Sequence, residues 1–258
     1  ALVRPGSVTP HPRLVPKAIL ADWPGMRVQH HDLARALEEM RLAGFAYDPR
    51  TGNGGYPKTV RMFALADSLH QSAAEVYQQQ LARIGMRVQV DVAGWPAYLA
   101  KVSRRRNVTM ATTGWQADYP DASSFFEPLL STASIQEEES QNMAFFSNRE
   151  LDTLIERARH SEASERERIF RRAEEIVAEE APWALGYNGR KLELWQPYVH
   201  GYSPNPVLSQ HVRGVWIDRG GRPTATALRS SRRALLPLAG ASPSRPRTTL
   251  QIAKRSAP

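Results

Sequence analysis

The fold is decided by the run Met86-Arg87-Val88-Gln89-Val90-Asp91-Val92, in which every second residue is apolar. Such alternation is typical of a β-strand with one buried face. Similar runs occur on either side of it, at residues 58–65 and 108–113. A helical pattern that Asp67 caps and Gly85 ends separates the first two runs, and a short helix is expected at 95–99. We therefore predict a βαβαβ unit whose right-handed crossovers make the three strands parallel.

The third predicted strand leads into a loop, Gly114-Trp115-Gln116-Ala117-Asp118-Tyr119-Pro120-Asp121, and then into an apolar segment that can form a short helix. In open α/β sheets, ligands collect beyond the carboxyl ends of the strands. Here a single acid, Asp118, stands between the large aromatic residues Trp115 and Tyr119. We therefore expect this loop to recognise a cationic group.

Two helices and a hairpin are expected in the second half of the chain. Asn148 caps the first helix, which has an apolar stripe, and residues 164–167 (Ser-Glu-Arg-Glu) form a capping box for the second, which Pro182 ends. The pair Asn188-Gly189 is a strong turn signal, so residues 183–187 and 191–195 are predicted to form a hairpin around it. A final strand is expected at 212–217.

The first thirty residues contain five prolines and are expected to be an extended chain wrapped over a surface. A helix capped by Asp32 and stopped by Gly44 follows. The adjacent His30 and His31 have no partner at i,i+4 and are not expected to bind a metal. The glycines at 52–55 precede a strand and lack a Gly-Lys-Ser/Thr ending, so they indicate a turn and not a phosphate loop.

The positive charge of the chain is confined to its end. The formal net charge is +8, and residues 219–258 contain nine Lys/Arg and no Asp/Glu. Subtracting those nine charges leaves −1 for residues 1–218. The end segment is rich in Arg, Pro, Ser and Ala and is predicted to be disordered. We therefore expect no nucleic-acid partner, and Arg104, Arg105 and Arg106 are expected to be solvated.

Composition excludes several classes of protein. No apolar run approaches the ~20 residues that a membrane span needs. The chain has no Cys, which excludes disulfides and thiolate metal sites. Its first residues do not look like a secretion signal. We find no Gly-x-Ser-x-Gly, His-Glu-x-x-His or P-loop motif, so we expect no catalytic residues, no cofactor and no enzyme activity.

Several motifs in the same order resemble the extracellular solute-binding proteins, family 5, which serve ABC importers of oligopeptides and dipeptides. They are residues 80–88 (Gln-Leu-Ala-Arg-Ile-Gly-Met-Arg-Val), 95–98 (Trp-Pro-Ala-Tyr), 114–121, 146–152 (Phe-Ser-Asn-Arg-Glu-Leu-Asp) and 181–183 (Ala-Pro-Trp). The resemblance extends from about Ala34 to Ile217.

The resemblance implies a fold and a division of the chain. Family members are similar to two-lobed clamps that close over a solute, so an α/β lobe of the periplasmic-binding-protein type is expected, with a mixed, partly parallel sheet flanked by helices and most of the first lobe missing. Residues 31–200 would form the second lobe, after the extended segment 1–30. Residues 201–218 would return toward the first lobe, and 219–258 would be the basic tail.

The resemblance also implies a ligand site. By motif position, Asp118 would hold the α-ammonium group of a peptide, while Trp115, Gln116 and Tyr119 would lie beside the first ligand residues. The peptide main chain would be bound in an extended form. The implied partners are a peptide or other small solute and the membrane permease subunits of an ABC transporter. The intact protein would act as a monomer in the periplasm or at the cell surface.

Other interpretations remain open at this stage. Asp118 could instead cap the following helix or pair with an arginine, although Asp121 is better placed for the cap. Trp115 could belong to the core or to a ligand wall, and Tyr119 and Trp95 favour packing. The solute could be a nickel complex or a sugar, because some members of the family look like carriers of such solutes, or a chain lacking one lobe could bind nothing.

Overall fold

The computed structural model describes residues 8–106, 109–189, 193–205, 212 and 214–218. The chain divides into a larger unit, Ala1–Leu192 with Asn205–Gln210, and a smaller unit, Glu193–Pro204 with His211–Pro258. The predicted disorder of residues 219–258 falls outside the described residues. Within the part of the chain that is described, no helix is long and apolar enough to cross a membrane.

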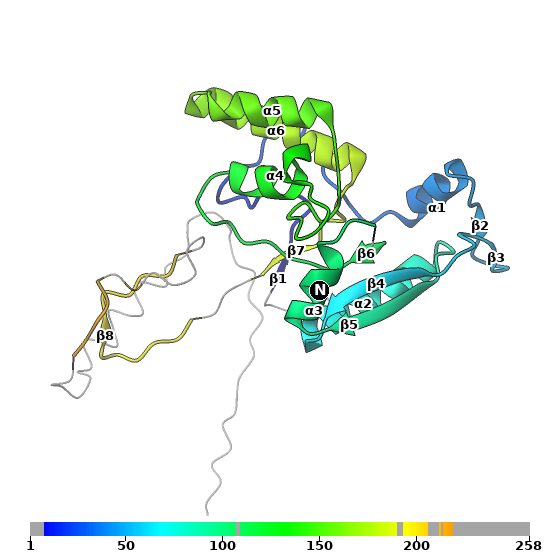
Figure 1. The fold of residues 1–258 in the computed structure, drawn as a ribbon, viewed down its shortest axis with the longest axis horizontal. Helices are drawn as coiled ribbons and strands as arrows, with labels where there is room; N and C mark the ends of the chain where they lie inside the picture. Colours follow the sequence, from blue (N-terminus) through cyan, green and yellow to red (C-terminus); the bar gives the residue numbers. More distant parts are fainter. Residues whose placement is uncertain (1–7, 107–108, 190–192, 206–211, 213, 219–258) are drawn as a thin grey trace, which may run out of the picture. The chain divides into compact units, whose positions relative to one another are not determined.

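A three-stranded parallel sheet forms the centre of the βαβαβ unit (Figure 1). Its strands are β4 (Val60–Leu65), β5 (Val88–Ala93) and β6 (Met110–Ala111), in the order β5-β4-β6. Val60 is paired with Val88, and Met62 with Met110. The predicted parallel sheet is therefore confirmed. Strand β6 is shorter than expected, and Val108 lies outside the described residues.

Helices cover both faces of this sheet. Helix α2 (Ser68–Ala82) begins where the Asp67 side chain accepts hydrogen bonds from the backbone N–H groups of Leu69 and His70, as its capping role predicted. Helix α3 (Trp95–Val102) follows β5. Successive β4 side chains point to opposite faces of the sheet, so two separate apolar clusters form. On one face, Val60, Met62 and Ala64 pack with Ala74 of α2. On the other face, Phe63 packs with Tyr98 and Val102 of α3.

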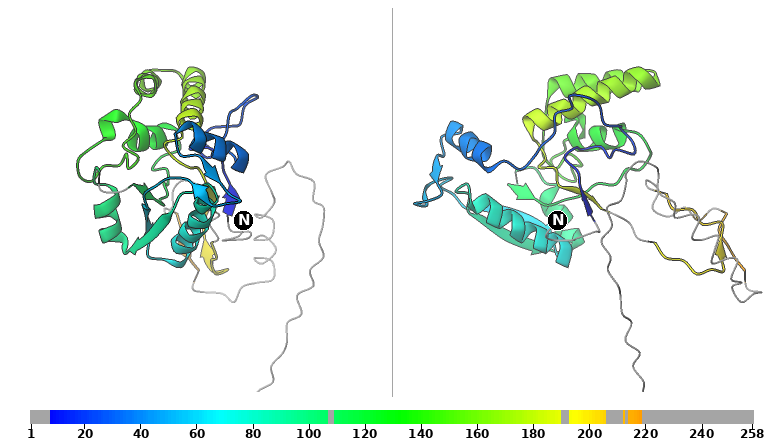
Figure 2. Two further views of the ribbon diagram at one scale, coloured as in Figure 1. Left: turned by 90° about the vertical axis from the view of Figure 1, so that its right-hand side faces the viewer. Right: turned by 180° about the vertical axis from the view of Figure 1, so that it is seen from behind.

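The largest core lies among α4 (Ser123–Leu130), α5 (Arg149–Arg159) and α6 (Ala163–Glu180), with the short 3-10 helix η1 (Thr132–Ser134) after α4. Helices α5 and α6 lie side by side in the views of Figures 1 and 2. Phe126 of α4 stacks on Phe170 of α6 with ring centroids 5.4 Å apart. The predicted apolar stripes are buried: Leu151, Leu154, Ile155 and Ala158 in α5, and Ile169, Phe170, Ala173, Ile176 and Val177 in α6.

The helix starts were predicted with mixed success. Asn148 caps α5 by accepting a hydrogen bond from the Leu151 backbone N–H, as expected. The capping box at residues 164–167 is wrong, because α6 begins at Ala163 and its N-cap residue Glu162 makes no side-chain cap. Ser164 therefore lies inside the helix. Glu165 and Glu167 form ion pairs instead, the latter with Arg171.

The hairpin predicted around Asn188-Gly189 is also wrong. These residues belong to strand β7 (Tyr187–Gly189), which pairs antiparallel with β1 (Val8–Pro10) near the start of the chain. Residues 193–195 form no strand, and 190–192 lie outside the described residues. Pairing with a segment almost 180 residues away has overridden the local turn preference of Asn-Gly.

Residues 8–30, the described part of the N-terminal segment, contain little regular structure beyond β1, as predicted, but they contribute to the core. Leu14, Val15 and Leu20 are buried in the cluster of α4, α5 and α6. The Glu174 carboxylate of α6 accepts hydrogen bonds from the backbone N–H groups of Leu14 at 3.1 Å and Val15 at 2.7 Å. Burial raises the pKa of Glu174, and these hydrogen bonds oppose the rise. A buried acid thus holds this segment on α6.

Short elements complete the description. Helix α1 (Leu33–Leu42) is capped by Asp32, and Gly44 follows it with φ +86°, both as predicted. Strands β2 (Tyr47–Asp48) and β3 (Asn53–Gly54) pair across a turn at residues 49–52. The turn therefore lies earlier than the one predicted at the glycines 52–55, because Asn53 and Gly54 belong to β3. In the smaller unit, β8 (Val199–His200) pairs antiparallel with β9 (Trp216–Ile217), which lies within the final strand predicted at 212–217.

Candidate functional site

The Asp118 loop leaves the carboxyl end of β6. The backbone N–H of Thr112 donates to the carbonyl oxygen of Phe63 in β4 at 2.9 Å, so the chain still follows the sheet one residue beyond β6. The Tyr98 hydroxyl of α3 donates to the carbonyl oxygen of Thr112. Burial raises the pKa of Tyr98, so this hydroxyl keeps its proton as a donor. The loop therefore starts from a fixed point at the sheet edge where ligands are expected.

The first turn of α4 holds the loop in place. The Trp115 indole Nε1 donates to the carbonyl oxygen of Ser124 at 2.7 Å, and the backbone N–H of Asp118 donates to the Ser124 Oγ at 2.9 Å. Ala117, between them, is buried against the α4 core. The Ser124 carbonyl oxygen and hydroxyl that accept these bonds belong to the first turn of α4. The helix therefore fixes the position of the loop backbone near Asp118.

The Asp118 carboxylate itself faces solvent. Asp118 is exposed, and no hydrogen bond or ion pair of its side chain occurs among the residues that the structure describes. Its backbone N–H is used, as described above, but its two carboxylate oxygens remain available. The arrangement can accept hydrogen bonds from an external cation such as an ammonium group.

The other predicted site residues lie around Asp118 with different degrees of burial. Trp115 is half-buried and packs against the α4 core, while its ring nitrogen is occupied by Ser124. Tyr119 is 45% exposed, and its hydroxyl lies 3.1 Å from the Ser123 Oγ. Gln116 is exposed and has an interaction of its own within the chain. The structure thus brings all four residues together on one loop.

Asp121, the second acid of the loop, has a protein partner. Its Oδ1 accepts hydrogen bonds from the backbone N–H of Ser123 at 2.8 Å and from the Ser123 hydroxyl at 2.6 Å. Arg166 of α6 binds both of its carboxylate oxygens, Oδ1 at 2.8 Å and Oδ2 at 3.0 Å. Partial burial alone would raise the pKa of Asp121, but the bonds from Arg166 and Ser123 lower it to about 2. Asp121 therefore has the structural role that the sequence left open for either acid.

Two supporting residues were missed at the sequence level. Arg166 was interpreted as part of a capping box, and Ser124 was given no role. Arg166 also donates to the carbonyl oxygen of Ala158, so it joins α5, α6 and the loop. No local sequence pattern identifies the contact between Asp121 and Arg166, because these residues meet only through the packing of α4 against α6.

Trp95 also lies at the carboxyl edge of the sheet. It is the first residue of α3 and is separated from β5 by Gly94 alone. It is 58% exposed and stacks on Tyr98 with ring centroids 6.2 Å apart. Its exposure is greater than the packing role predicted for it. Among the described residues, no group of three or more His, Cys, Asp or Glu side chains is arranged to hold a metal ion.

Comparisons with known proteins identify a family for this chain. Residues 2–137 match the family described as bacterial extracellular solute-binding proteins, family 5 Middle. The chain is 28% identical over 222 residues to di/tripeptide-binding protein 4 of Pseudomonas aeruginosa, covering 82% of this chain and 38% of that protein. It is 30% identical over 146 residues to heme-binding protein A of Haemophilus influenzae, covering 56% of this chain and 26% of that protein.

Solved structures show the same fold. The ABC transporter-associated periplasmic binding protein DppA of Helicobacter pylori, in complex with the peptide STSA, matches with a TM-score of 0.68 and 24% identity. The match covers 83% of this chain and 40% of that one. A dipeptide binding protein from a Pseudoalteromonas species, in complex with Met-Leu, also matches with a TM-score of 0.68, at 21% identity.

The chain spans only part of these proteins, between 26% and 38% of the two curated relatives named above. The family match nevertheless includes more than half of its residues, and it contains the parallel sheet and the Asp118 loop. The chain therefore belongs to the bacterial extracellular solute-binding proteins, family 5, a family of binding proteins and not of enzymes.

Proposed function

We propose that this chain provides one wall of a solute site that captures peptides by their free amino terminus, as the second lobe of an ABC-importer binding protein. In this proposal the lobe comprises residues 31–200, and residues 201–218 return toward the first lobe. Its partners are a peptide and the membrane permease subunits of the importer. The names of the relatives, which include a di/tripeptide-binding protein and periplasmic binding proteins, support this assignment and a periplasmic or cell-surface location.

The proposal is carried by the contrast between the two acids of the loop. Asp121 is paired with Arg166, whereas Asp118 is exposed and has no side-chain partner among the described residues. A carboxylate and an ammonium group ~4 Å apart attract by roughly 4 kcal/mol at an effective dielectric constant near 20. An unpaired acid on a fixed loop at the sheet edge therefore favours ligands that carry a free amino group.

The neighbouring residues would surround the first ligand residues. Trp115 and Tyr119 would provide apolar surface on either side of Asp118, and Gln116 would provide polar groups for the ligand main chain. The Trp115 indole N–H is already satisfied by Ser124, so the ring can contact a ligand through its face without leaving a polar atom unpaired.

Relatives in the family are also named for heme and for glutathione. Glutathione, like a di- or tripeptide, carries a free amino group that a carboxylate can bind. The contrast between Asp118 and Asp121 therefore favours an amino-terminal ligand over heme, and it does not by itself select one peptide.

A titration of the isolated chain tests this proposal. Because one wall cannot enclose a ligand, we expect trialanine to bind in the millimolar range, which NMR titration of the ¹⁵N-labelled chain can detect. N-acetylated trialanine should bind at least tenfold more weakly, and so should trialanine to the Asp118→Asn variant. Equal binding of both peptides would overturn the amino-terminal assignment. Micromolar heats from a calorimetric titration with mixed tripeptides would overturn the expectation that one wall binds weakly.

A further inference from the structure

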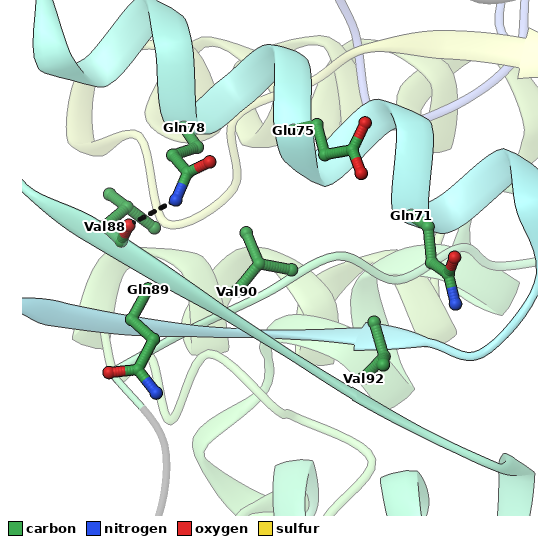
Figure 3. A pocket seen from close by; sticks show the side chains of 7 residues that line it. All are labelled: Gln71, Glu75, Gln78, Val88, Gln89, Val90 and Val92. Atoms are coloured by element: carbon green, nitrogen blue, oxygen red, sulfur yellow. Dashed lines mark hydrogen bonds between the residues drawn. The ribbon is translucent and has the colours of Figure 1, made fainter.

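A polar groove runs between helix α2 and strand β5 (Figure 3). Its volume is ≈ 550 Å³. It is lined by three α2 residues, Gln71, Glu75 and Gln78, and by four β5 residues, Val88, Gln89, Val90 and Val92. None of the four predicted peptide-site residues lines it. The groove is therefore a second candidate surface for binding.

The floor of the groove is an open sheet edge. Strand β5 is the outer strand in the order β5-β4-β6. The carbonyl oxygens of Arg87 and Ala93 accept hydrogen bonds from the chain of β4, at Val60 and Ala66. Backbone groups of alternate residues point to opposite sides of a strand, so the N–H and C=O groups of Val88, Val90 and Val92 point away from β4.

One of these outward groups already has a side-chain partner. The Gln78 Nε2 of α2 donates to the carbonyl oxygen of Val88 at 2.6 Å (Figure 3). Among the residues that the structure describes, the backbone groups of Val90 and Val92 have no such partner on their outer side. An edge of this kind is a template for a further strand.

The α2 wall gives the groove a negative centre. Gln71, Glu75 and Gln78 follow each other at helical spacing and project over β5 (Figure 3). Glu75 is exposed and forms no ion pair within the described ranges. Among the described residues, no Lys or Arg lines the groove. A ligand that fits it therefore offers backbone hydrogen bonds to β5 and a basic side chain to Glu75.

We propose that this groove binds an extended segment of a partner protein by strand addition to β5, with a Lys or Arg of that segment facing Glu75. The partner segment would use the outward backbone groups of Val90 and Val92, and Gln71 and Gln78 would bind its polar side chains. A second copy of this chain is disfavoured as the occupant, because pairing two β5 edges would bring a second Glu75 wall to a groove whose described lining residues include no cation.

A blocked peptide tests the proposal separately from the peptide site. The probe is acetyl-Thr-Val-Lys-Val-Thr-Val-amide, which lacks the free ammonium group that Asp118 would bind. Added to the ¹⁵N-labelled full chain, it should cause saturable shifts at the amides of Val90 and Val92 and slow their hydrogen exchange. The Asp118→Asn variant should bind it unchanged. The proposal would be overturned if the saturable shifts were confined to residues 114–121. It would also be overturned if millimolar concentrations of the probe caused no shifts.

Three variants separate the contributions of charge and of the edge. Glu75→Gln should weaken probe binding about two- to fivefold, the size expected for an exposed ion pair, and added salt should have the same effect. Val92→Pro removes an outward N–H without removing a bond to β4 and should abolish binding. The control Glu180→Gln changes an exposed acid outside the groove and should have no effect.

Further results would count against strand addition. If Val92→Pro retains the dispersed spectrum of the folded chain and still binds the probe, the edge is not used. If the Val90 and Val92 amides are already protected in the absence of the probe, and sedimentation shows a dimer that Val92→Pro dissociates, a second copy occupies the groove and the proposed partner is wrong. Equal binding of a probe with Glu in place of Lys would exclude the role of Glu75.

Discussion

Arg166 of α6 binds the carboxylate of Asp121 through two nitrogens, with Nη2 2.8 Å from Oδ1 and Nε 3.0 Å from Oδ2. This pair connects the end of the Asp118 loop to a helix 45 residues later in the chain. It leaves Asp118, three residues earlier, as the acid of the loop whose carboxylate faces solvent without a described partner. The two acids therefore have different roles, and substitutions at each should have different effects.

Asp121→Asn should destabilise the fold, whereas Asp118→Asn should not. The Asn side chain keeps a hydrogen-bond acceptor for Ser123 but removes the charge that Arg166 binds. Because both side chains are partly exposed, we expect a loss of about 1–2 kcal/mol in the free energy of unfolding for Asp121→Asn. Asp118→Asn should remain within about 0.5 kcal/mol of the unchanged chain. Urea unfolding of both variants measures the difference, and equal losses would contradict the assigned roles.

The contribution of Asp121 to stability should depend on pH in a defined direction. Its pKa in the folded chain is lowered to about 2 from an ordinary value of 3.8. A lowered pKa means that the stabilisation is complete above the unfolded pKa and is lost as the pH falls toward about 2. The difference in unfolding free energy between the unchanged chain and Asp121→Asn should be constant above about pH 5 and shrink below about pH 4. A difference that grows on acidification would have the wrong sign.

Glu174→Ala should loosen the N-terminal segment from α6. The substitution leaves the backbone N–H groups of Leu14 and Val15 buried without an acceptor, and each unsatisfied group costs about 1–3 kcal/mol. We expect a total loss of about 2–4 kcal/mol, with faster hydrogen exchange at both amides. The Glu174→Gln variant retains one side-chain oxygen and should lose less. Unchanged exchange at Leu14 and Val15 in the Ala variant would show that Glu174 does not hold the segment.

Phe126→Ala tests the core among α4, α5 and α6, against which the Asp118 loop packs. Phe126 is fully buried and stacks on Phe170, so removing its ring should cost about 3–5 kcal/mol in the free energy of unfolding. Thermal and urea unfolding provide the measurement. As a control, Phe45→Ala removes a ring that contacts Tyr56 and lies outside the α4 core, and it should cost less. A larger loss at Phe45 would place the main core elsewhere.

Local patterns predicted the parts of the fold that depend on neighbours in sequence. The alternation of Val88, Val90 and Val92 identified β5, because every second side chain of a strand points to one face. Asp67 and Asn148 identified helix starts, since each caps amides two or three residues away. The loop that carries Asp118 was located for the same reason, as the segment between a strand and a helix.

Contacts between distant segments could not be predicted in the same way. Asn188 and Gly189 form a strand because β1 supplies a partner across the chain, and no property of the dipeptide indicates that partner. Glu174 is a charged residue of the kind expected on the solvent side of a helix, yet it is buried because the N-terminal segment covers it. The sequence likewise does not indicate that Arg166 pairs with Asp121, because the packing of α4 against α6 brings them together. The sequence alone therefore left both Asp118 and Asp121 as candidates.

A crystal structure of the chain soaked with trialanine would test the central assignment most directly. The account predicts that the peptide amino nitrogen lies about 2.7–3.0 Å from an Asp118 carboxylate oxygen, with the peptide extended between Trp115 and Tyr119. Asp121 should remain bound to Arg166 in the same crystal. A peptide whose amino nitrogen is bound elsewhere, with Asp118 still facing solvent, would contradict the account.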